Sequence, residues 1–165
     1  MAVVELERYQ HPDPGFEIDL PQGVELGVMP GMVLVARLPL DESRSPFRGN
    51  LTIVAQELPA GVDVAAHGDA SLAEEARSLP NWRLIDRAPA EVGGLPAERT
   101  LATYRLGRDS GIDAGRALSV TVEQWRLLRD GLAWIVSVSC ESSEYGLFCD
   151  LWTACAESLR PGEAA

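Results

Sequence analysis

The sequence predicts an α+β fold, in which a mainly antiparallel β-sheet of six to seven strands packs with two principal helices. Two observations lead to this prediction. Several segments alternate apolar and polar residues with the period of two that half-buried strands show, and short turns join them. Two other segments place their apolar residues at helical spacing. Strands joined by hairpins form antiparallel sheets, and a helix with one apolar stripe must pack onto such a sheet.

Eight segments carry a strand pattern. Most alternate strictly, whereas MVLVA and LTIVAQEL are apolar runs typical of well-buried strands. The eight lie at residues 16–20, 24–28, 32–36, 51–58, 82–88, 97–106, 117–128 and 132–140. The Asp-Gly pair before the last strand is a strong hairpin turn, because both positions favour a positive φ. The segment HPDPG before the first strand is a turn-rich lead-in.

The two helices follow from caps and apolar stripes. Asp63 is the expected cap of a helix that extends to Leu79. Ser142 or Ser143 is the expected cap of the last helix, whose apolar stripe occupies residues 148–159. Allowing for one strand of error, the order is three strands, a helix, four strands in hairpins and a helix.

The length and charge of the chain limit its partners and location. Its 165 residues fit a single domain, residues 1–165, with an ordered core at about residues 14–160. The net charge of −11 argues against binding to nucleic acid or to anionic membranes. No apolar run approaches the ~20 residues of a membrane span, so we expect no membrane insertion. The N-terminal apolar run ends at Val4, too early for a secretory signal, so we expect a cytoplasmic protein.

No residue pattern indicates catalysis, a metal or a cofactor. The three Cys are an odd number clustered late in the chain, which is no disulfide framework. His11 and His67 have no Cys, Asp or His neighbour at metal-ligand spacing. There is no G-x-S-x-G nucleophile turn, and without any Lys the chain lacks a phosphate-binding loop. We therefore expect that the protein is not an enzyme and has no catalytic, metal-binding or cofactor-binding residues.

Trp125 is the residue that best marks a contact surface. It falls on the polar face of its strand, together with Ser119. An aromatic side chain on a polar face is either covered by a helix or loop, or exposed as a binding anchor, and both alternatives stay open. Arg99, Arg105 and Arg126 fall on neighbouring strands. With Trp125 they would form a surface for a ligand or a partner, and an ordinary solvated sheet face is the alternative.

Short motifs follow one another in a specific order. They are Phe-x-x-x-x-Pro-x-Gly from Phe16, Phe-Arg-x-Asn from Phe47, and a Gly-x-Pro-Ala hairpin from Gly94 before a strand that ends at Tyr104. In this order and spacing the chain resembles the actinobacterial LpqN/LpqT type of the Mog1/PsbP-like superfamily, over about residues 14–160. All 14 basic residues are Arg, which agrees with the codon usage of a GC-rich actinobacterial genome.

The resemblance implies an α/β/α sandwich that binds partners without catalysis. Relatives in this superfamily include a Ran-GTPase-binding protein, a photosystem extrinsic subunit, envelope lipoproteins and chaperone-adaptors of secreted toxins. Arg48 and Asn50 match the strand start of the family. We expect a structural role there, with the Asn50 side chain tying the loop by hydrogen bonds, and a ligand role is the alternative. The Lpq relatives carry a lipoprotein signal that this sequence does not show, which argues against an envelope role.

The leading hypothesis is a non-catalytic protein-interaction module, such as an adaptor or chaperone for a secreted or membrane-associated partner. Its partner would be another protein, and a homodimer is a further expectation. The alternatives are a small-ligand-binding domain that uses the cleft between sheet and helix, and an enzyme of unknown class such as a hydrolase. Residues 1–81 carry 13 acidic residues and 5 Arg, whereas residues 82–165 carry 12 and 9. A basic partner would be drawn to the first part, and the later sheet is the better place for a specific contact.

Overall fold

The computed structural model describes residues 4–39, 44–109 and 116–162. Within these ranges the elements, in chain order, are β1 (Leu6–Pro12), β2 (Gly15–Pro21), β3 (Glu25–Gly27), β4 (Leu34–Arg37), β5 (Asn50–Glu57), α1 (Val64–Ser78), β6 (Arg83–Val92), β7 (Leu95–Leu106), β8 (Leu118–Arg129), β9 (Leu132–Glu141), α2 (Tyr145–Glu157) and β10 (Arg160–Pro161).

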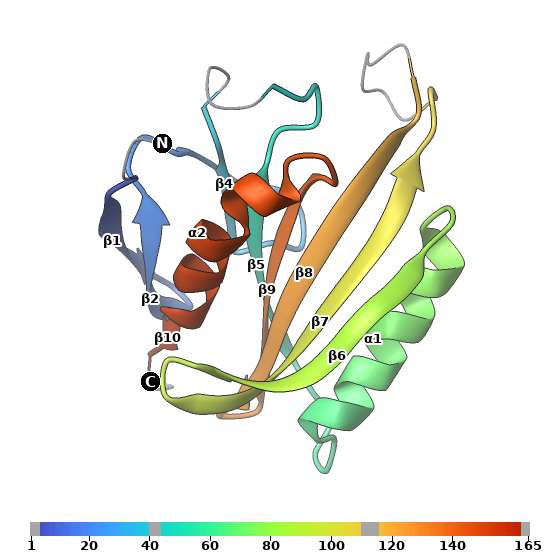
Figure 1. Ribbon diagram of the computed structural model, residues 1–165. Coiled ribbons are helices and arrows are strands. Elements are labelled where there is room, and N and C mark those ends of the chain that lie inside the picture. The colour runs from blue at the N-terminus through green and yellow to red at the C-terminus, as the bar shows by residue number, and fades with distance from the viewer. Residues whose placement is uncertain (1–3, 40–43, 110–115, 163–165) are drawn as a thin grey trace.

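Seven strands form one antiparallel sheet, in the order β3-β4-β5-β9-β8-β7-β6. The strands β1, β2 and β10 form a second, three-stranded sheet. Helix α1 lies against β7 and β8 on one face of the large sheet, and α2 lies on the other face together with the small sheet (Figure 1). The predicted α+β class, with an antiparallel sheet and two helices, is confirmed.

The apolar core lies between the large sheet, α2 and the small sheet. Phe16 of β2, Trp125 of β8, Trp134 of β9 and Trp152 of α2 are all buried in one cluster. The ring of Phe16 meets that of Trp134 edge-on, with their centroids 5.7 Å apart. This geometry suits the ring quadrupoles, so the small sheet is attached to the large one by apolar contacts.

Strand β1 is absent from the sequence prediction, whereas the predicted turn in HPDPG is present and joins β1 to β2. Most β1 side chains are exposed, so no apolar alternation announces the strand. Its pairing with β2 instead brings opposite charges together, because Arg8 lies 2.9 Å from Asp19 and 3.2 Å from Glu17. From the sequence, residues 16–20 are expected in the main sheet. They lie in β2 and belong to the small sheet, because β2 pairs with β1 and β10.

The two helix starts have different outcomes. Asp63 caps α1 as predicted, since its Oδ1 accepts a hydrogen bond from the Ala66 backbone N–H at 2.7 Å. The prediction of a serine cap for α2 is wrong, because the N-cap is Glu144, without a side-chain cap hydrogen bond. The Ser142 hydroxyl is engaged with the sheet, where it accepts a hydrogen bond from Thr121 at 2.9 Å.

Gly93 joins the β6–β7 hairpin to the end of α2. Its N–H donates to the Glu157 carbonyl at 2.9 Å, and its φ is +56°. A Cβ at Gly93 would lie 2.2 Å from the carbonyl oxygen of Leu159, whereas at Gly94, with φ +80°, it would meet nothing within 4 Å.

We expect Gly93→Ala to lower the free energy of unfolding by ~3 kcal/mol or more, because left-handed strain and a backbone clash add together. Gly94→Ala is the matched control and should lose only about 1 kcal/mol, from the strain alone. Urea unfolding of both variants measures the difference. Equal losses would show that Gly93 does not fix this contact.

Candidate functional site

The structure does not bring the four predicted surface residues together. Trp125 and Arg126 are neighbours on β8, so they point to opposite faces, and both side chains are fully buried. Trp125 lies in the core with Trp152 of α2, so the alternative of a covered Trp125 holds and an exposed anchor there is excluded. Arg99 and Arg105 share the α2 side of β7, where Arg105 is exposed and Arg99 is partly buried.

The predicted motif residues Arg48 and Asn50 make local contacts. Arg48 Nε donates to the Leu38 carbonyl at 2.9 Å, and its guanidinium lies 2.9 Å from the carboxylate of Glu25. The Asn50 amide donates to the Arg48 carbonyl at 3.1 Å. These contacts are of the kind expected for a structural role.

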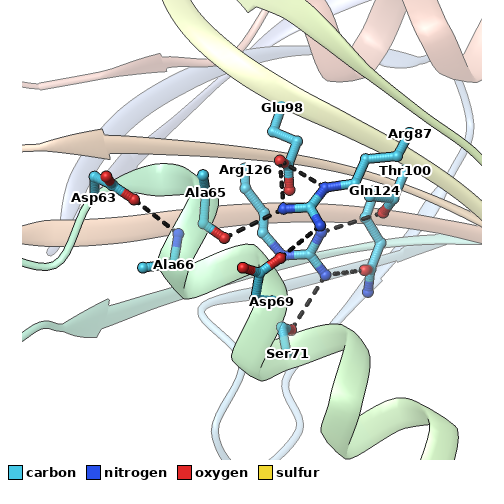
Figure 2. Close-up of polar contacts among 10 residues, drawn as sticks. All are labelled: Asp63, Ala65, Ala66, Asp69, Ser71, Arg87, Glu98, Thr100, Gln124 and Arg126. Atoms are coloured by element: carbon cyan, nitrogen blue, oxygen red, sulfur yellow. Dashed lines mark hydrogen bonds and ion pairs between the residues drawn. The ribbon is translucent and has the colours of Figure 1, made fainter.

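Arg126 is the centre of a polar cluster between α1 and the sheet, here called the α1 cluster, in which it is joined by His67, Glu75, Arg87 and Glu98. Figure 2 shows the guanidinium of Arg126 reaching from β8 toward α1. It donates to Thr100 Oγ1 and to Ser71 Oγ, both at 3.1 Å, and also to the side-chain oxygen of Gln124. Its ion pair with Glu75 measures 3.4 Å. Contacts to both the sheet and the helix therefore compensate the buried charge.

Burial lowers the pKa of Arg126, and the carboxylates of Glu75 and Glu98 oppose this effect. An arginine keeps its proton at any ordinary pH, so a full positive charge lies under the helix. Its Nε has no hydrogen-bond partner among the described residues. Only some of the N–H donors of Arg126 therefore have partners that stabilise its buried charge.

Arg87 and Glu98 extend the α1 cluster to the edge strand β6. Arg87 donates from Nε to Glu98 Oε2 at 2.8 Å and from Nη1 to Asp69 at 2.6 Å, and it also donates to the Ala65 carbonyl of α1 at 3.2 Å (Figure 2). A Cβ at Gly68 would lie only 2.2 Å from Glu98 Oε1. A side chain at this position would therefore displace the Glu98 carboxylate from its place against the helix.

His67 faces the same cluster from α1 and is buried. The amide nitrogen of Gln56 lies 2.8 Å from His67 Nε2, which therefore accepts the hydrogen bond of a neutral ring. Nδ1 has no hydrogen-bond partner among the described residues. Burial first, and then the charge of Arg126, lower the pKa of His67, while Glu98 opposes them. The folded state therefore favours the neutral ring.

Sequence reasoning missed the α1 cluster, although two signals for it are present. His67, Ser71 and Glu75 recur every four residues, so one stripe of α1 is polar where it meets the sheet. On β8, the face that begins with Leu118 changes from apolar residues to Gln124 and Arg126. Matching polar stripes on a helix and on a strand face predict a polar contact between them.

A second polar group lies on the α2 side of the sheet, beside the start of α2. Glu123 is buried there, and its carboxylate accepts hydrogen bonds from Arg99 Nε and, at 3.0 Å, from the Tyr145 hydroxyl. The hydrogen bond to Glu123 is the main reason why the pKa of Arg99 is raised. Burial and the charge of Glu123 raise the pKa of Tyr145 to about 12. Arg99 is thus engaged in an internal ion pair.

Arg105 lines a pocket of about 360 Å³ at the ends of β6, β7 and β8, here called the arginine pocket. Its walls are Asn81, Arg83, Thr103, Tyr104, Arg105 and Ser119. Of the four residues predicted to form a surface, only Arg105 lines this pocket. Arg83 of β6 lines the pocket beside Arg105, and no sequence pattern marks Arg83 as a site residue.

The remaining candidates for chemistry are the Cys thiols and the side chains that could hold a metal ion. All three Cys are free, and burial raises the pKa of the Cys140 and Cys155 thiols to about 12. Thiols with such a pKa are poor nucleophiles at neutral pH. No group of three or more His, Cys, Asp or Glu among residues 4–39, 44–109 and 116–162 is arranged to hold a metal ion. No helix in these ranges is long and apolar enough to cross a membrane.

We expect Arg126→Met to lower the free energy of unfolding by about 3 kcal/mol, because it leaves the half-buried Glu75 without its cation and removes the hydrogen bonds to Thr100 and Ser71. Arg77→Met is the control, since the ion pair between Arg77 and Glu74 is exposed and should change stability by no more than ~0.5 kcal/mol. Thermal and urea unfolding measure both. A stability equal to that of the wild type in Arg126→Met would show that the buried charge is not needed to hold α1.

Stability should also fall as the pH drops below about 6.5, the ordinary pKa of histidine. The folded-state pKa of His67 is depressed, so the unfolded chain takes up this proton first and acid favours unfolding. The contribution is fully present above about pH 6.5 and is lost toward the lower, folded-state pKa. Unfolding experiments from about pH 7 to about pH 5 should therefore give a smaller decline in His67→Gln than in the wild type. The same decline in both proteins contradicts the prediction.

No protein-family model and no curated protein matches this chain. Solved structures match it in fold. The cyanobacterial PsbP protein CyanoP, from Synechocystis, has 15% identity and a TM-score of 0.64, over 98% of this chain and 95% of CyanoP. LpqN of Mycobacterium tuberculosis, involved in cell envelope biogenesis, has 16% identity and a TM-score of 0.62, over 94% of this chain and 90% of LpqN. The Ran-binding protein Mog1p of Saccharomyces cerevisiae has 10% identity and a TM-score of 0.58, over 96% of each chain.

These neighbours contradict the prediction of a cytoplasmic location. LpqN is involved in cell envelope biogenesis, which points away from the cytoplasm, and the prediction is dropped. Identities of 10–16% establish the fold alone. The chain has the Mog1/PsbP-like α+β fold.

Proposed function

We propose that the protein is a non-catalytic protein-interaction module whose contact surface is the β6 edge of the large sheet. The observation that carries this proposal is the exposure of two large apolar side chains on that edge. Leu84 is 41% and Ile85 is 59% exposed, and β6 is the outermost strand of the sheet. Neighbouring apolar side chains on an edge strand are a liability unless a partner covers them.

A β-bulge strengthens the case for this segment. The register between β6 and β7 shifts between Leu84 and Asp86, so Ile85 lies at the irregularity. Bulges change the direction of side chains at strand edges and are frequent next to functional sites. The bulge therefore supports a role for Ile85 in contacts outside the chain.

The fold neighbours support an interaction role in general terms. Mog1p is a Ran-binding protein, which is a binding function on the same fold. Within this fold we infer the LpqN/LpqT type, because the motifs at Phe16, Phe47 and Gly94 occur in the order of that type. The role of an adaptor or chaperone for a secreted or membrane-associated partner is the specific form of this proposal.

The alternative of a ligand cleft between sheet and helix has less support. The space under α1 is occupied by Arg126 and the buried side chains of His67 and Leu72. The space under α2 is occupied by Trp125 and Trp152. The chain's own side chains therefore fill the space between each helix and the sheet.

Photo-crosslinking from position 85 tests the proposal. We expect p-benzoylphenylalanine in place of Ile85, introduced into the full chain in its native host, to give a discrete crosslinked product with another protein. The same group in place of Glu91, an exposed residue on the same strand, is the matched control and should give none. The product should disappear when Leu84→Asp is added, because a charge there opposes burial of the edge.

Position 28 provides the competing outcome. Val28 is 86% exposed and lies after β3, at the opposite edge of the sheet. A product from position 28 and none from position 85 would place the contact surface at the β3 edge and overturn the proposed one. A product equal to twice the mass of the chain would identify a second copy as the occupant, in place of a different protein.

A further inference from the structure

The arginine pocket is polar and cationic, although the protein as a whole is acidic. Its walls contain two Arg, together with the side chains of Asn, Ser, Thr and Tyr, and no carboxylate. The chain has 25 acidic residues against 14 Arg. A recess of this size without any acidic wall is therefore unusual for this surface, and its chemistry is that of an anion site.

Arg83 and Arg105 are the two cations of this pocket. Neither makes an ion pair with a carboxylate in the ranges that the structure describes, whereas eight other Arg do. Arg99, for example, is committed to Glu123 and Asp86. The donors of Arg83 and Arg105 are therefore available to a ligand.

The backbone brings the two side chains close together. Arg83 pairs with Thr103 across the β6–β7 ladder, and Arg105 lies two residues further along the same face. Such diagonal neighbours on a sheet are roughly 7–8 Å apart, which lets two long side chains meet over one small group. Two like charges at this distance repel each other, and an anion between them removes the repulsion.

The walls of the pocket are fixed by the sheet. The Arg105 backbone N–H donates to the Pro80 carbonyl at 2.9 Å, which ties the segment before β6 to β7. Asn81 has a φ of +53°, a conformation that Asn tolerates better than most residues, and this places it at the pocket. Arg105 pairs with Ser119 of β8 on the other side. The backbone of the pocket is therefore fixed before binding, and only the two Arg side chains have to be ordered by a ligand.

From these observations we propose that the arginine pocket binds a carboxylate of an acidic segment on the protein partner. This inference rests on the proposed function, because Arg83 directly precedes Leu84 and Ile85 on β6. The pocket and the exposed apolar pair therefore lie on one continuous stretch of the edge. Arg guanidinium groups bind carboxylates through paired hydrogen bonds, and the apolar pair adds contact area beside them.

The net charge of the chain favours a carboxylate over a phosphate. At −11 the protein repels an approaching anion, and this repulsion grows with the charge that a ligand concentrates on a single group. A phosphate group carries close to two charges at neutral pH, whereas a carboxylate carries one. An Asp or Glu side chain is thus the anion that this pocket can accept at the lowest cost.

The test is a titration of the full chain with a tetraglutamate peptide, followed by NMR of the arginine Nε–H groups. We expect the signals of Arg83 and Arg105 to shift and that of Arg160, exposed on β10 of the small sheet, to stay unchanged. A tetraglutamine peptide should shift none of them. Inorganic phosphate at the same concentration should bind more weakly.

The matched variants are Arg83→Gln with Arg105→Gln, compared with Arg160→Gln. The double variant should weaken tetraglutamate binding by about tenfold or more, since it removes two charge-assisted contacts. Arg160→Gln should change it by less than about twofold. Both variants alter exposed side chains, and unchanged unfolding midpoints confirm that they fold.

The outcomes separate this inference from the proposed function. If the double variant binds tetraglutamate as tightly as the wild type, or if the wild type does not bind it, the inference about the pocket is wrong. The crosslink at position 85 then remains an independent test of the proposed function. Tighter binding of phosphate at the same two Arg overturns the assignment to a carboxylate. Binding at the pocket with no crosslink at position 85 overturns the proposed contact surface while the anion site stands.

Discussion

A buried positive charge determines how α1 packs on the sheet. Arg126 is fully buried, and removing such a charge from water costs several kcal/mol unless polar partners compensate it. Thr100 and Gln124 on the sheet, with Ser71 and Glu75 on α1, provide these partners. The helix can therefore occupy only positions from which its polar stripe reaches the guanidinium. The register between α1 and β8 follows from this requirement more than from apolar shape.

The two faces of the large sheet are consequently held by different forces. On the α2 side, Phe16, Trp125, Trp134 and Trp152 form an apolar cluster that joins three layers. On the α1 side, ion pairs and hydrogen bonds accompany the apolar contact of Leu72, and Arg87 extends the polar contacts to the edge strand β6. The segment that carries Arg83 and Ile85 is thus connected to α1 through charges. A single strand carries both a structural cation and the proposed contact surface.

The sequence predicts the fold class, the hairpins and the cap at Asp63, because each depends on local periodicity or local hydrogen bonding. It does not predict β1, whose pairing depends on the charges of Arg8 and Asp19 and not on apolar alternation. The candidate site is harder to predict from the sequence. Trp125 and Arg126 are adjacent in the sequence but lie on opposite faces, and only tertiary packing decides that both are covered. Arg83 has no pattern of its own and becomes notable only when the fold places it beside Arg105.

The composition of the α1 contact also determines how this helix can detach. Leu72 is the only large apolar side chain of α1 that is buried, so the helix itself contributes little apolar area to this contact. Heat-capacity changes and denaturant sensitivity both scale with the surface that an opening exposes. Detachment of α1 therefore has a smaller heat-capacity change and a weaker dependence on urea than opening of the α2 side, which exposes three Trp side chains. Salt, which screens charges, acts mainly on the first of these two motions.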